Sequence, residues 1–286
     1  MPNQKSWRTK GFKIPQNASS WDKEWFMKSE KNAEKLRRTR ERYNSHEGNI
    51  IGFVRTIEGL KKEFKLDLTR VIEPLILQKL TSGPTEILDS GAGHGLISAG
   101  LLAHFGKKVK VTALGLEELP PAKTLKQNID ATLKSIEKKT DPWNQSSSNV
   151  LRSAKSFLPT YSKMRRKIKQ ARVFFENYSP GKQYDVIVDL TGPSWHTGFH
   201  TRTLEQIFNL LKPNGTAILF ANSLITKQAF ELGNPNGKYA KETGYYFVLD
   251  KRIKNFDVYK KVPVTKKSRP VKRNPNYTGA WSFRTN

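Results

Sequence analysis

The sequence predicts an α/β fold, a doubly wound and mostly parallel sheet with a helical N-terminal extension and basic terminal arms. Three observations lead to this prediction. Apolar strand patterns alternate with amphipathic helix patterns from residue 86 to about residue 250. A glycine-rich turn joins the first of these strands to the first helix. The basic residues gather at both ends of the chain and in one internal segment, 152–172, so the rest of the chain is nearly neutral.

The elements are expected in the following order. Residues 1–48 form a basic arm with a charged helix at 21–43, and residues 49–85 lead into the core as two helices. The core spans 86–262, and the tail 263–286 is extended and basic. Within the core, strands are predicted at 86–90, 108–116, 171–178, 184–192, 216–223, 244–253 and 256–264, and helices at 96–105, 121–139 and 201–211. Residues 140–149 read as a loop, and 152–172 as a basic helical insertion.

The charge of the chain is concentrated in three segments. The net charge is +26, and residues 1–43 carry 12 Lys and Arg against 5 acids. Residues 152–172 carry 8 against none, and residues 251–286 carry 11 against 1. Segregated charge of one sign repels itself, which favours a polyanionic partner over a role in solubility alone. The partner expected for these segments is nucleic acid, specifically RNA.

A glycine-rich turn follows the first predicted strand. Gly91, Gly93 and Gly95 occupy alternate positions after the apolar pair Ile87 and Leu88, and a helical pattern begins directly afterwards. Glycine costs about 0.5–1 kcal/mol relative to alanine inside a helix or a strand, so this spacing favours a tight turn that approaches a ligand closely. The helix that follows presents its free N–H groups to an anionic group of that ligand.

The residues of this turn, Asp89-Ser90-Gly91-Ala92-Gly93-His94-Gly95, resemble motif I of the class I S-adenosylmethionine-dependent methyltransferases. The segment YDVIVDLTGP, followed by LLKPNGTAILF, is similar to that family's fourth strand, next helix and turn into the fifth strand. The resemblance covers residues 86 to about 250 and implies a Rossmann-like methyltransferase fold with S-adenosylmethionine as its cofactor. A phosphate-binding Walker loop would end in Gly-Lys-Ser/Thr, which is absent here. A dinucleotide-binding fingerprint would have a small residue in place of Leu96. The turn therefore matches neither of these alternatives.

The resemblance also implies a set of cofactor-binding residues. The three glycines and the helix N-terminus would hold the cofactor's carboxylate, and Asp89 its ammonium group. The family's ribose-binding acid falls near Gly115 here, and glycine has no carboxylate. The role is therefore assigned to Glu117, and Glu118 is the second choice. Glu176, with Asn177 beside it, is expected near the adenine. The full set is Asp89, Gly91, Gly93, Gly95, Glu117, Glu176 and Asn177. The alternative roles are a cap of the turn for Asp89 and solvated loop acids for the others.

The substrate side is expected in the segment DLTGPSWHTGFH, after the fourth strand. Asp189, Trp195 and His196 are the candidate catalytic residues, because Trp195 could stack on a base and either of the others could accept a proton. The alternative is that Trp195 packs over the core and His196 is merely exposed. The segment lacks the N/D-P-P-Y/F pattern of exocyclic amino N-methyltransferases, and strand five lacks the lysine of 2′-O-ribose methyltransferases. The chain has no cysteine, which excludes cysteine-dependent C5 methylation of pyrimidines, and no metal ligand is assigned.

Together these features predict a methyltransferase acting on RNA or an RNA–protein assembly, with RNA bound through residues 1–43, 152–172 and 251–286. Two alternatives stay open: a catalytically inactive methyltransferase-like RNA-binding or assembly factor, and a methyltransferase of proteins or small molecules. No apolar run approaches the roughly 20 residues of a membrane span, and the N-terminus lacks the apolar centre of a secretory signal. An intracellular, cytoplasmic location is therefore expected, and the basic N-terminus leaves organelle targeting open.

Overall fold

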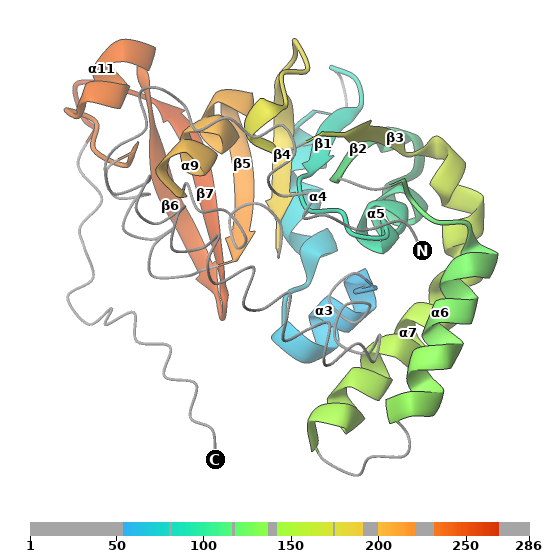
Figure 1. Cartoon of the computed structure of the whole chain (residues 1–286). Coiled ribbons are helices and arrows are strands. Elements are labelled where there is room, and N and C mark those ends of the chain that lie inside the picture. Colours follow the sequence, from blue (N-terminus) through green and yellow to red (C-terminus); the bar gives the residue numbers. More distant parts are fainter. Residues whose placement is uncertain are drawn as a thin grey trace. The chain divides into compact units, whose positions relative to one another are not determined.

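The core of the protein is a seven-stranded sheet with the strand order β3-β2-β1-β4-β5-β7-β6 (Figure 1). The computed structural model describes residues 54–79, 82–115, 118–136, 142–173, 175–190, 200–220 and 232–268. The strands are β1 (Thr85–Asp89), β2 (Val109–Gly115), β3 (Lys169–Arg172), β4 (Tyr184–Asp189), β5 (Leu211–Phe220), β6 (Tyr245–Ile253) and β7 (Phe256–Pro263). The predicted arm at 1–48 and most of the predicted tail lie outside the described residues.

The pairing of the strands confirms the predicted fold class. β1 to β5 are mutually parallel, whereas β7 is antiparallel to both of its neighbours, β5 and β6. The strand order runs outward from β1 in one direction and from β4 in the other, so the sheet has its topological switch point between these two strands. A doubly wound sheet of this order, closed by an antiparallel hairpin, is the Rossmann-like methyltransferase fold that the sequence predicts.

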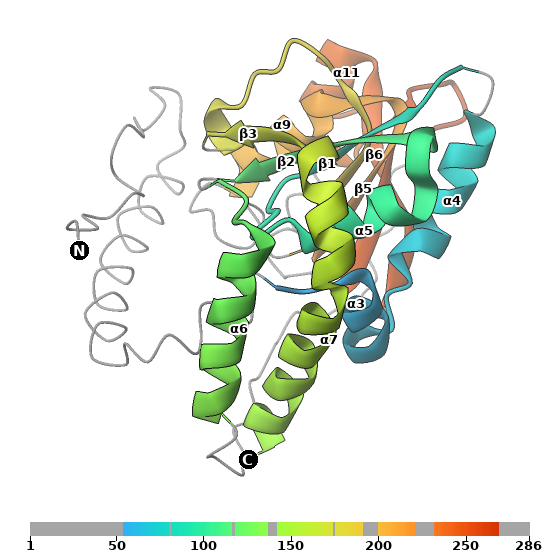
Figure 2. The ribbon, with the colours of Figure 1, turned by 90° about the vertical axis from the view of Figure 1, so that its right-hand side faces the viewer.

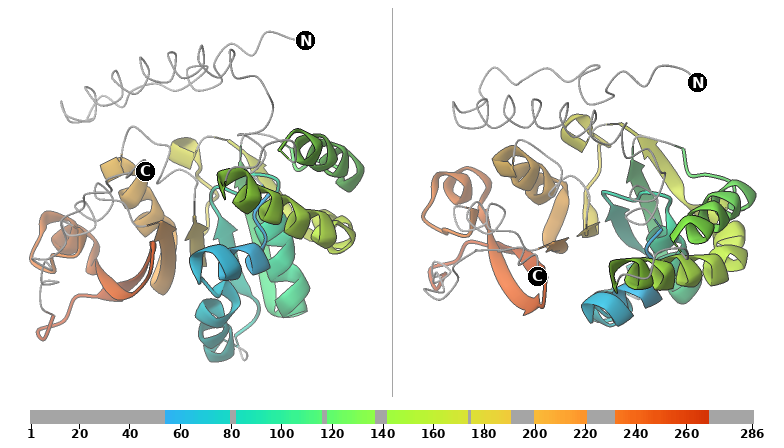
Figure 3. Two further views of the ribbon diagram at one scale, coloured as in Figure 1. Left: turned by 90° about the horizontal axis from the view of Figure 1, so that it is seen from below. Right: turned by 60° about the horizontal axis from the view of Figure 1, so that its bottom comes forward.

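Helices cover both faces of the sheet. The described helices are α3 (Ile57–Phe64), α4 (Leu68–Gln78), α5 (Leu96–Phe105), α6 (Ala122–Ile136), α7 (Pro142–Met164), α9 (His200–Leu210) and α11 (Lys238–Thr243), with short 3₁₀ turns η1 (Gly106–Lys108), η2 (Arg165–Lys167) and η3 (Phe175–Asn177). The cluster on one face includes residues of α3 to α7, and the cluster on the other includes residues of η3 and α9. Figure 2 shows α6 and α7 side by side. Figure 3 shows them at the opposite end of the sheet from the β6–β7 hairpin.

The central strands alternate between the two clusters, as the two-residue period of a strand requires. Val186 and Val188 of β4 pack on the side of α5, whereas Ile187 between them packs on the side of α9. Every residue of β4 is buried, which is the pattern of a parallel strand covered on both faces. The core is thus two apolar layers divided by the sheet.

Two sequence-based assignments between β2 and β4 were wrong. The segment predicted as the loop 140–149 is helical from Pro142 onward, because proline is compatible with the first helical position and Ser147 and Ser148 are small enough to be buried. The third strand, predicted at 171–178, is Lys169–Arg172, and Phe175 packs into the core from a 3₁₀ turn. The apolar run there reflects burial in a turn, which periodicity does not distinguish from a strand.

Residues 152–172 are an integral part of the core rather than an addition to it. They form the second half of α7, then η2 and β3. Apolar side chains of this segment, Ala154, Leu158, Tyr161 and Ile168, belong to the same buried cluster as those of α5 and β1. The basic residues of the segment are therefore divided among α7, the turn η2 and strand β3, all of which belong to the connection from β2 into the sheet.

The two outer strands are interrupted or short. β3 pairs with β2 over only four residues, Thr112 to Gly115, so no described strand lies beside Val109–Val111 on that edge. β6 pairs with β7 along most of its length, but the register shifts between Leu249 and Lys251.

Among the helices of the described ranges, none combines the length and the hydropathy that a membrane crossing needs.

Candidate cofactor and substrate site

The glycine turn lies at the carboxyl ends of three strands. The Ser90 amide donates to the carbonyl of Val188 in β4 (2.9 Å), and the Ala92 amide donates to that of Leu114 in β2 (3.2 Å). Gly93 and Gly95 have φ angles of 52° and 77°, in the left-handed region that favours glycine. A Cβ atom on Gly95 would lie 2.7 Å from Leu119 Cδ2, so the turn also packs closely against the segment after β2. The predicted tight turn at the switch point is therefore present.

Asp89, the last residue of β1, is buried and bonded to the turn that follows it. Its Oδ2 accepts a hydrogen bond from Ser98 Oγ in α5 (2.7 Å), and its carboxylate also accepts from the backbone N–H groups of Ser98 and Gly91. These bonds give α5 an acidic partner at its N-terminus, where Gly95 offers no side-chain cap. The geometry fits the capping role, and it keeps the carboxylate at the place where the ammonium group is expected.

A second buried carboxyl group, that of Asp189, ends the neighbouring strand β4. Asp89 is 3% exposed and Asp189 is fully buried. Burial raises the pKa of Asp89 to about 6; the bonds from Ser98 and Gly91 oppose this rise, and the charge of Asp189 adds to it. Two carboxyl groups at the switch point form a site in which a cationic group would be stabilised, because it would offset the cost of burying their charge.

The segment after β2 is held by side chains from α7, η2 and β3. Tyr161 Oη donates to the carbonyl of Pro120 (2.8 Å), and Arg165 Nε donates to that of Leu119 (2.7 Å). The Leu119 amide in turn donates to Gln170 Oε1 (3.1 Å). Three bonds therefore hold the backbone of Leu119 and Pro120, and Leu119 packs against Gly95.

The candidate acids of this segment differ in how far the structure describes them. Glu117 lies outside the described residues. Glu118, the second choice, is 66% exposed and forms an ion pair with Arg165 Nη2 at 3.1 Å, so its charge is already partnered. Arg165, in the basic segment 152–172, turns inward onto this part of the chain, because the Leu119 carbonyl and the Glu118 carboxylate lie within its reach.

The remaining candidates follow β3 and β4. Glu176 and Asn177 belong to η3, shortly after the end of β3 at Arg172, so the fold brings their backbone to the same edge of the sheet as the glycine turn. Asn177 is exposed. The side chain of Glu176, and the whole of Trp195 and His196, lie outside what the structure describes. Of the three candidate catalytic residues, only Asp189 is therefore placed.

Some residues that build this site escaped the sequence analysis. Ser98, Tyr161, Arg165 and Gln170 all bond to the glycine turn or to the segment after β2. Ser98 is marked only by being one of the two polar residues, with His104, of a mostly apolar helix. Arg165 stands in a run of basic residues, where nothing in the sequence separates it from its exposed neighbours.

Several charged side chains of the basic segments form ion pairs or hydrogen bonds within the fold. Lys155 pairs with Asp130 (2.7 Å), Arg252 with Asp257 (2.5 Å) and Lys260 with Asp250 (2.9 Å). Lys261 is buried and donates to the carbonyls of Phe208 (3.0 Å) and Leu211 (2.8 Å) at the end of α9. The part of 251–286 that lies in β6 and β7 thus uses much of its charge inside the sheet.

Comparison with known proteins gives similarity in fold alone. No family model matches the chain, and no curated protein matches it. An rRNA methylase from Streptococcus thermophilus is 12% identical, with a TM-score of 0.33 over 66% of this chain and 93% of that one. The N-methyltransferase NodS from Bradyrhizobium japonicum, solved with S-adenosyl-L-homocysteine, is 10% identical, with a TM-score of 0.34 over 72% and 91%. TrmN from Thermus thermophilus is 14% identical, with a TM-score of 0.35 over 73% and 53%.

Proposed function

We propose that this chain is an S-adenosylmethionine-dependent methyltransferase whose substrate is RNA or an RNA–protein assembly. The observation that carries the proposal is the glycine turn at the switch point, with two left-handed glycines and the buried carboxyl groups of Asp89 and Asp189 beside it. In open α/β sheets, ligands bind beyond the carboxyl ends of the strands at this point.

The groups at this site fit the cofactor's chemistry. S-adenosylmethionine carries an ammonium and a sulfonium group, and the two buried carboxyl groups are suited to a cationic ligand. It also carries a carboxylate, which suits the N-terminus of α5 beyond the glycine turn. Glu117 for the ribose and Glu176 with Asn177 for the adenine complete the proposed set.

The cofactor supplies an activated methyl group, and the chain's part is to bind and to position. The backbone of the glycine turn allows close approach, because two of its residues adopt conformations that a side chain would strain. Tyr161 and Arg165 hold the segment after β2 against that turn. Methyl transfer depends chiefly on holding the acceptor in line, and a base helps where the acceptor bears a proton. Asp189 is the base candidate within the described residues, and His196 is proposed for the same role.

RNA as the substrate rests on the charge distribution. After the ion pairs described above, exposed lysines and arginines such as Lys163, Arg166 and Lys167 have no carboxylate partner within the part of the chain that the structure describes. Unpaired cations gathered in segments of one sign suit the evenly spaced phosphates of a nucleic acid.

The proposal is tested in two steps. Isothermal titration calorimetry with S-adenosylmethionine, and with its demethylated product, should show binding to the full chain. Incubation with tritiated cofactor and separated RNA, protein and metabolite fractions of a cell lysate should then place the label in RNA. Label in protein or metabolites without RNA would contradict the substrate class. Cofactor binding with no transfer to any fraction would contradict the proposed activity.

A second candidate is an inactive methyltransferase-like RNA-binding or assembly factor. It is favoured because two acids that are candidates for cofactor binding already have partners within the protein. Asp89 caps α5, and Glu118 pairs with Arg165. Calorimetry separates the two candidates. Absence of heat with both forms of the cofactor, from a chain that still binds RNA, would favour the assembly factor.

A further inference from the structure

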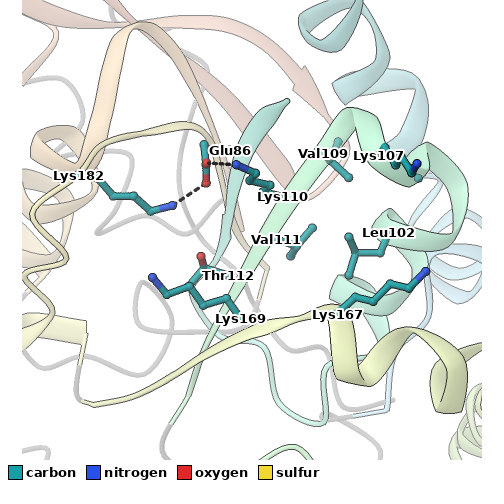
Figure 4. A pocket seen from close by; sticks show the side chains of 11 residues that line it. Glu86, Leu102, Lys107, Val109, Lys110, Val111, Thr112, Lys167, Lys169 and Lys182 are labelled. Atoms are coloured by element: carbon teal, nitrogen blue, oxygen red, sulfur yellow. Dashed lines mark hydrogen bonds and ion pairs between the residues drawn. The ribbon is translucent and has the colours of Figure 1, made fainter. Parts of the chain in front are cut away.

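A basic cavity lies at the amino ends of the strands, whereas the glycine turn lies at their carboxyl ends. Its volume is 410 Å³, and Figure 4 shows its lining. The lining residues come from β1, α5, η1, β2, η2, β3 and the segment before β4: Glu86, Leu102, Gly106, Lys107, Val109, Lys110, Val111, Thr112, Lys167, Lys169 and Lys182. The cavity is of a size that binds ligands, since such sites span roughly 300–1,000 Å³.

The short third strand accounts for the position of the cavity. β3 begins opposite Thr112, so the preceding residues of β2, Val109 to Val111, have no described strand beside them on that edge. β2 runs for seven residues from this end to Gly115. At about 3.3 Å per residue, the lining residues Val109 to Thr112 lie about 10–20 Å from the carboxyl end of the strand, where the cofactor site is proposed.

The lining carries five lysines and one acid. Glu86 pairs with Lys182 (2.5 Å) and, at 4.0 Å, with Lys110. Lys107, Lys167 and Lys169 have no carboxylate within ion-pair distance among the residues that the structure describes. In Figure 4, Lys107 and Lys167 lie on the side of Leu102, and Lys169 and Lys182 lie across from them. Lysine side chains thus line the cavity on two sides.

An anion in this cavity would be attracted to the surrounding lysines, because charges of one sign gathered around a hollow raise the local positive potential. The lining offers no aromatic side chain on which a base could stack, and no asparagine, glutamine or arginine for the edge of a base. Lysine acts on phosphate as a flexible point charge rather than as a directional fork. The cavity is therefore suited to phosphate groups and not to a nucleobase.

We propose that this cavity binds the phosphodiester backbone of RNA, at a second contact site about 10–20 Å from the proposed catalytic edge. The identity of the polymer rests on the proposed function, whereas the phosphate chemistry rests on the cavity itself. A strand held here is contacted without regard to its sequence, so the cavity contributes to affinity and to the placement of the substrate, not to the choice of base. Lys107, Lys167 and Lys169 make the contacts, and Glu86 keeps Lys110 and Lys182 in place.

The test compares two variants of the full chain with equal loss of charge. The cavity variant carries Lys107→Gln, Lys167→Gln and Lys169→Gln. The control carries Lys65→Gln, Lys134→Gln and Lys241→Gln, which are exposed lysines remote from this lining in the sequence and outside the three basic segments. Binding of a fluorescein-labelled single-stranded RNA of about 20 nucleotides is measured by anisotropy between about 50 and about 200 mM salt.

The cavity variant should lose affinity by about tenfold or more, and its slope of log K against log salt should shrink by about 2, since each lost phosphate contact on a single strand removes about 0.7. The control should change by less than about threefold, with nearly the parent slope. Replacing the same three cavity lysines by arginine should restore RNA affinity, which separates lost charge from lost folding. Equal effects of both glutamine triples, or no effect of either, would overturn the proposal.

Inorganic tripolyphosphate, titrated by calorimetry, separates RNA from a small anion. If the cavity variant loses tripolyphosphate binding but keeps parent RNA affinity, the cavity is a small-anion site and the proposal is overturned. Calorimetry with S-adenosylmethionine is run on the same proteins and should give parent affinity in the cavity variant. A parent chain that binds RNA through the cavity but gives no heat with the cofactor would contradict the proposed function and leave this inference standing.

Discussion

The hydroxyl group of Ser98 donates a 2.7 Å hydrogen bond to Oδ2 of Asp89, and this bond joins the first turn of α5 to the end of β1 across the glycine turn. Both residues are buried, at 0% and 3% exposure. The bond is charge-assisted when the carboxyl group is ionised, so it stabilises that form. The glycine turn is thereby closed by a side-chain contact as well as by its own backbone bonds.

Ser98→Ala should lower the free energy of unfolding by roughly 1.5–3 kcal/mol, the range for a hydrogen bond to a charged group. It should also raise the pKa of Asp89 further, because the ionised form loses a donor. Denaturant unfolding at neutral pH measures the first effect. Ser156→Ala is the matched control, since the exposed Ser156 hydroxyl donates only to a carbonyl within α7. Similar losses of unfolding free energy in both variants would show that the bond to Asp89 contributes no more to stability than the bond within α7.

Asp89 should make the fold less stable as the pH rises from about 4 to about 6. Burial raises its pKa from 3.8 to about 6, so in this window the folded chain holds a proton that the unfolded chain has released. In Asp89→Asn this titration is absent. The stability of the parent relative to the variant should therefore fall by roughly 3 kcal/mol across the window. Unfolding curves for both proteins at several pH values measure the difference, and a difference independent of pH would contradict the raised pKa.

Gly93→Val should abolish cofactor binding while the chain still folds. Its φ of 52° disfavours a β-branched residue, and the added side chain would fill the space in which the ligand approaches the backbone. Gly244→Val is the control, because Gly244 has a similar φ of 74° at the end of α11, outside the proposed site. Calorimetry should give parent affinity for the control alone. Parent affinity in Gly93→Val would remove this turn from the site.

Arg165→Gln should release the segment after β2. The variant loses the bond to the Leu119 carbonyl and the ion pair with Glu118, so amide exchange at Leu119 should rise and cofactor affinity should fall by about tenfold, equivalent to about 1.4 kcal/mol. Hydrogen exchange followed by mass spectrometry reports on the segment directly. Arg166→Gln should leave exchange there unchanged, since this exposed neighbour has no such contact among the described residues. Equal exchange in parent and Arg165→Gln would rule out the holding role.

Lys261→Met should destabilise the fold by roughly 1–3 kcal/mol, because two carbonyl groups at the end of α9 lose their buried donor. Lys260→Met, on the opposite face of the same strand, breaks only a half-exposed ion pair with Asp250 and should cost less than about 1 kcal/mol. Denaturation midpoints compare the two. If RNA affinity falls while stability is unchanged in Lys261→Met, then Lys261 acts on a partner rather than within the sheet.

The sequence predicted the parallel core well because its signals there are local. Alternating apolar strands and the glycine turn each determine structure within a few residues, and α5 spans the predicted residues 96–105. The region from 140 to 178 was harder to predict. There Ser147 and Ser148 are buried by tertiary packing and Phe175 is buried from a turn, and neither effect leaves a periodic pattern.

The candidate site was predictable as a place but not as a set of contacts. Motif spacing located the turn and the strand ends, and the fold brings these together at one edge. The partners of Asp89 and of the segment after β2 come from distant parts of the chain, as with Arg165, which lies 46 residues from Leu119. A single sequence gives no information on such pairs. It also does not distinguish the one basic residue of a run that bonds within the fold from its exposed neighbours.

The two open edges of the sheet also decide how this chain can associate with others. β3 offers four residues, of which the first and last are Lys169 and Arg172, and β6 breaks its register near Lys251 and Arg252. Short strands, irregular pairing and positive side chains all oppose the addition of a further strand from a second copy. Strand exchange and fibrous aggregation are therefore disfavoured at both edges, in the part of the chain that the structure describes, and an approaching macromolecule meets positively charged side chains there.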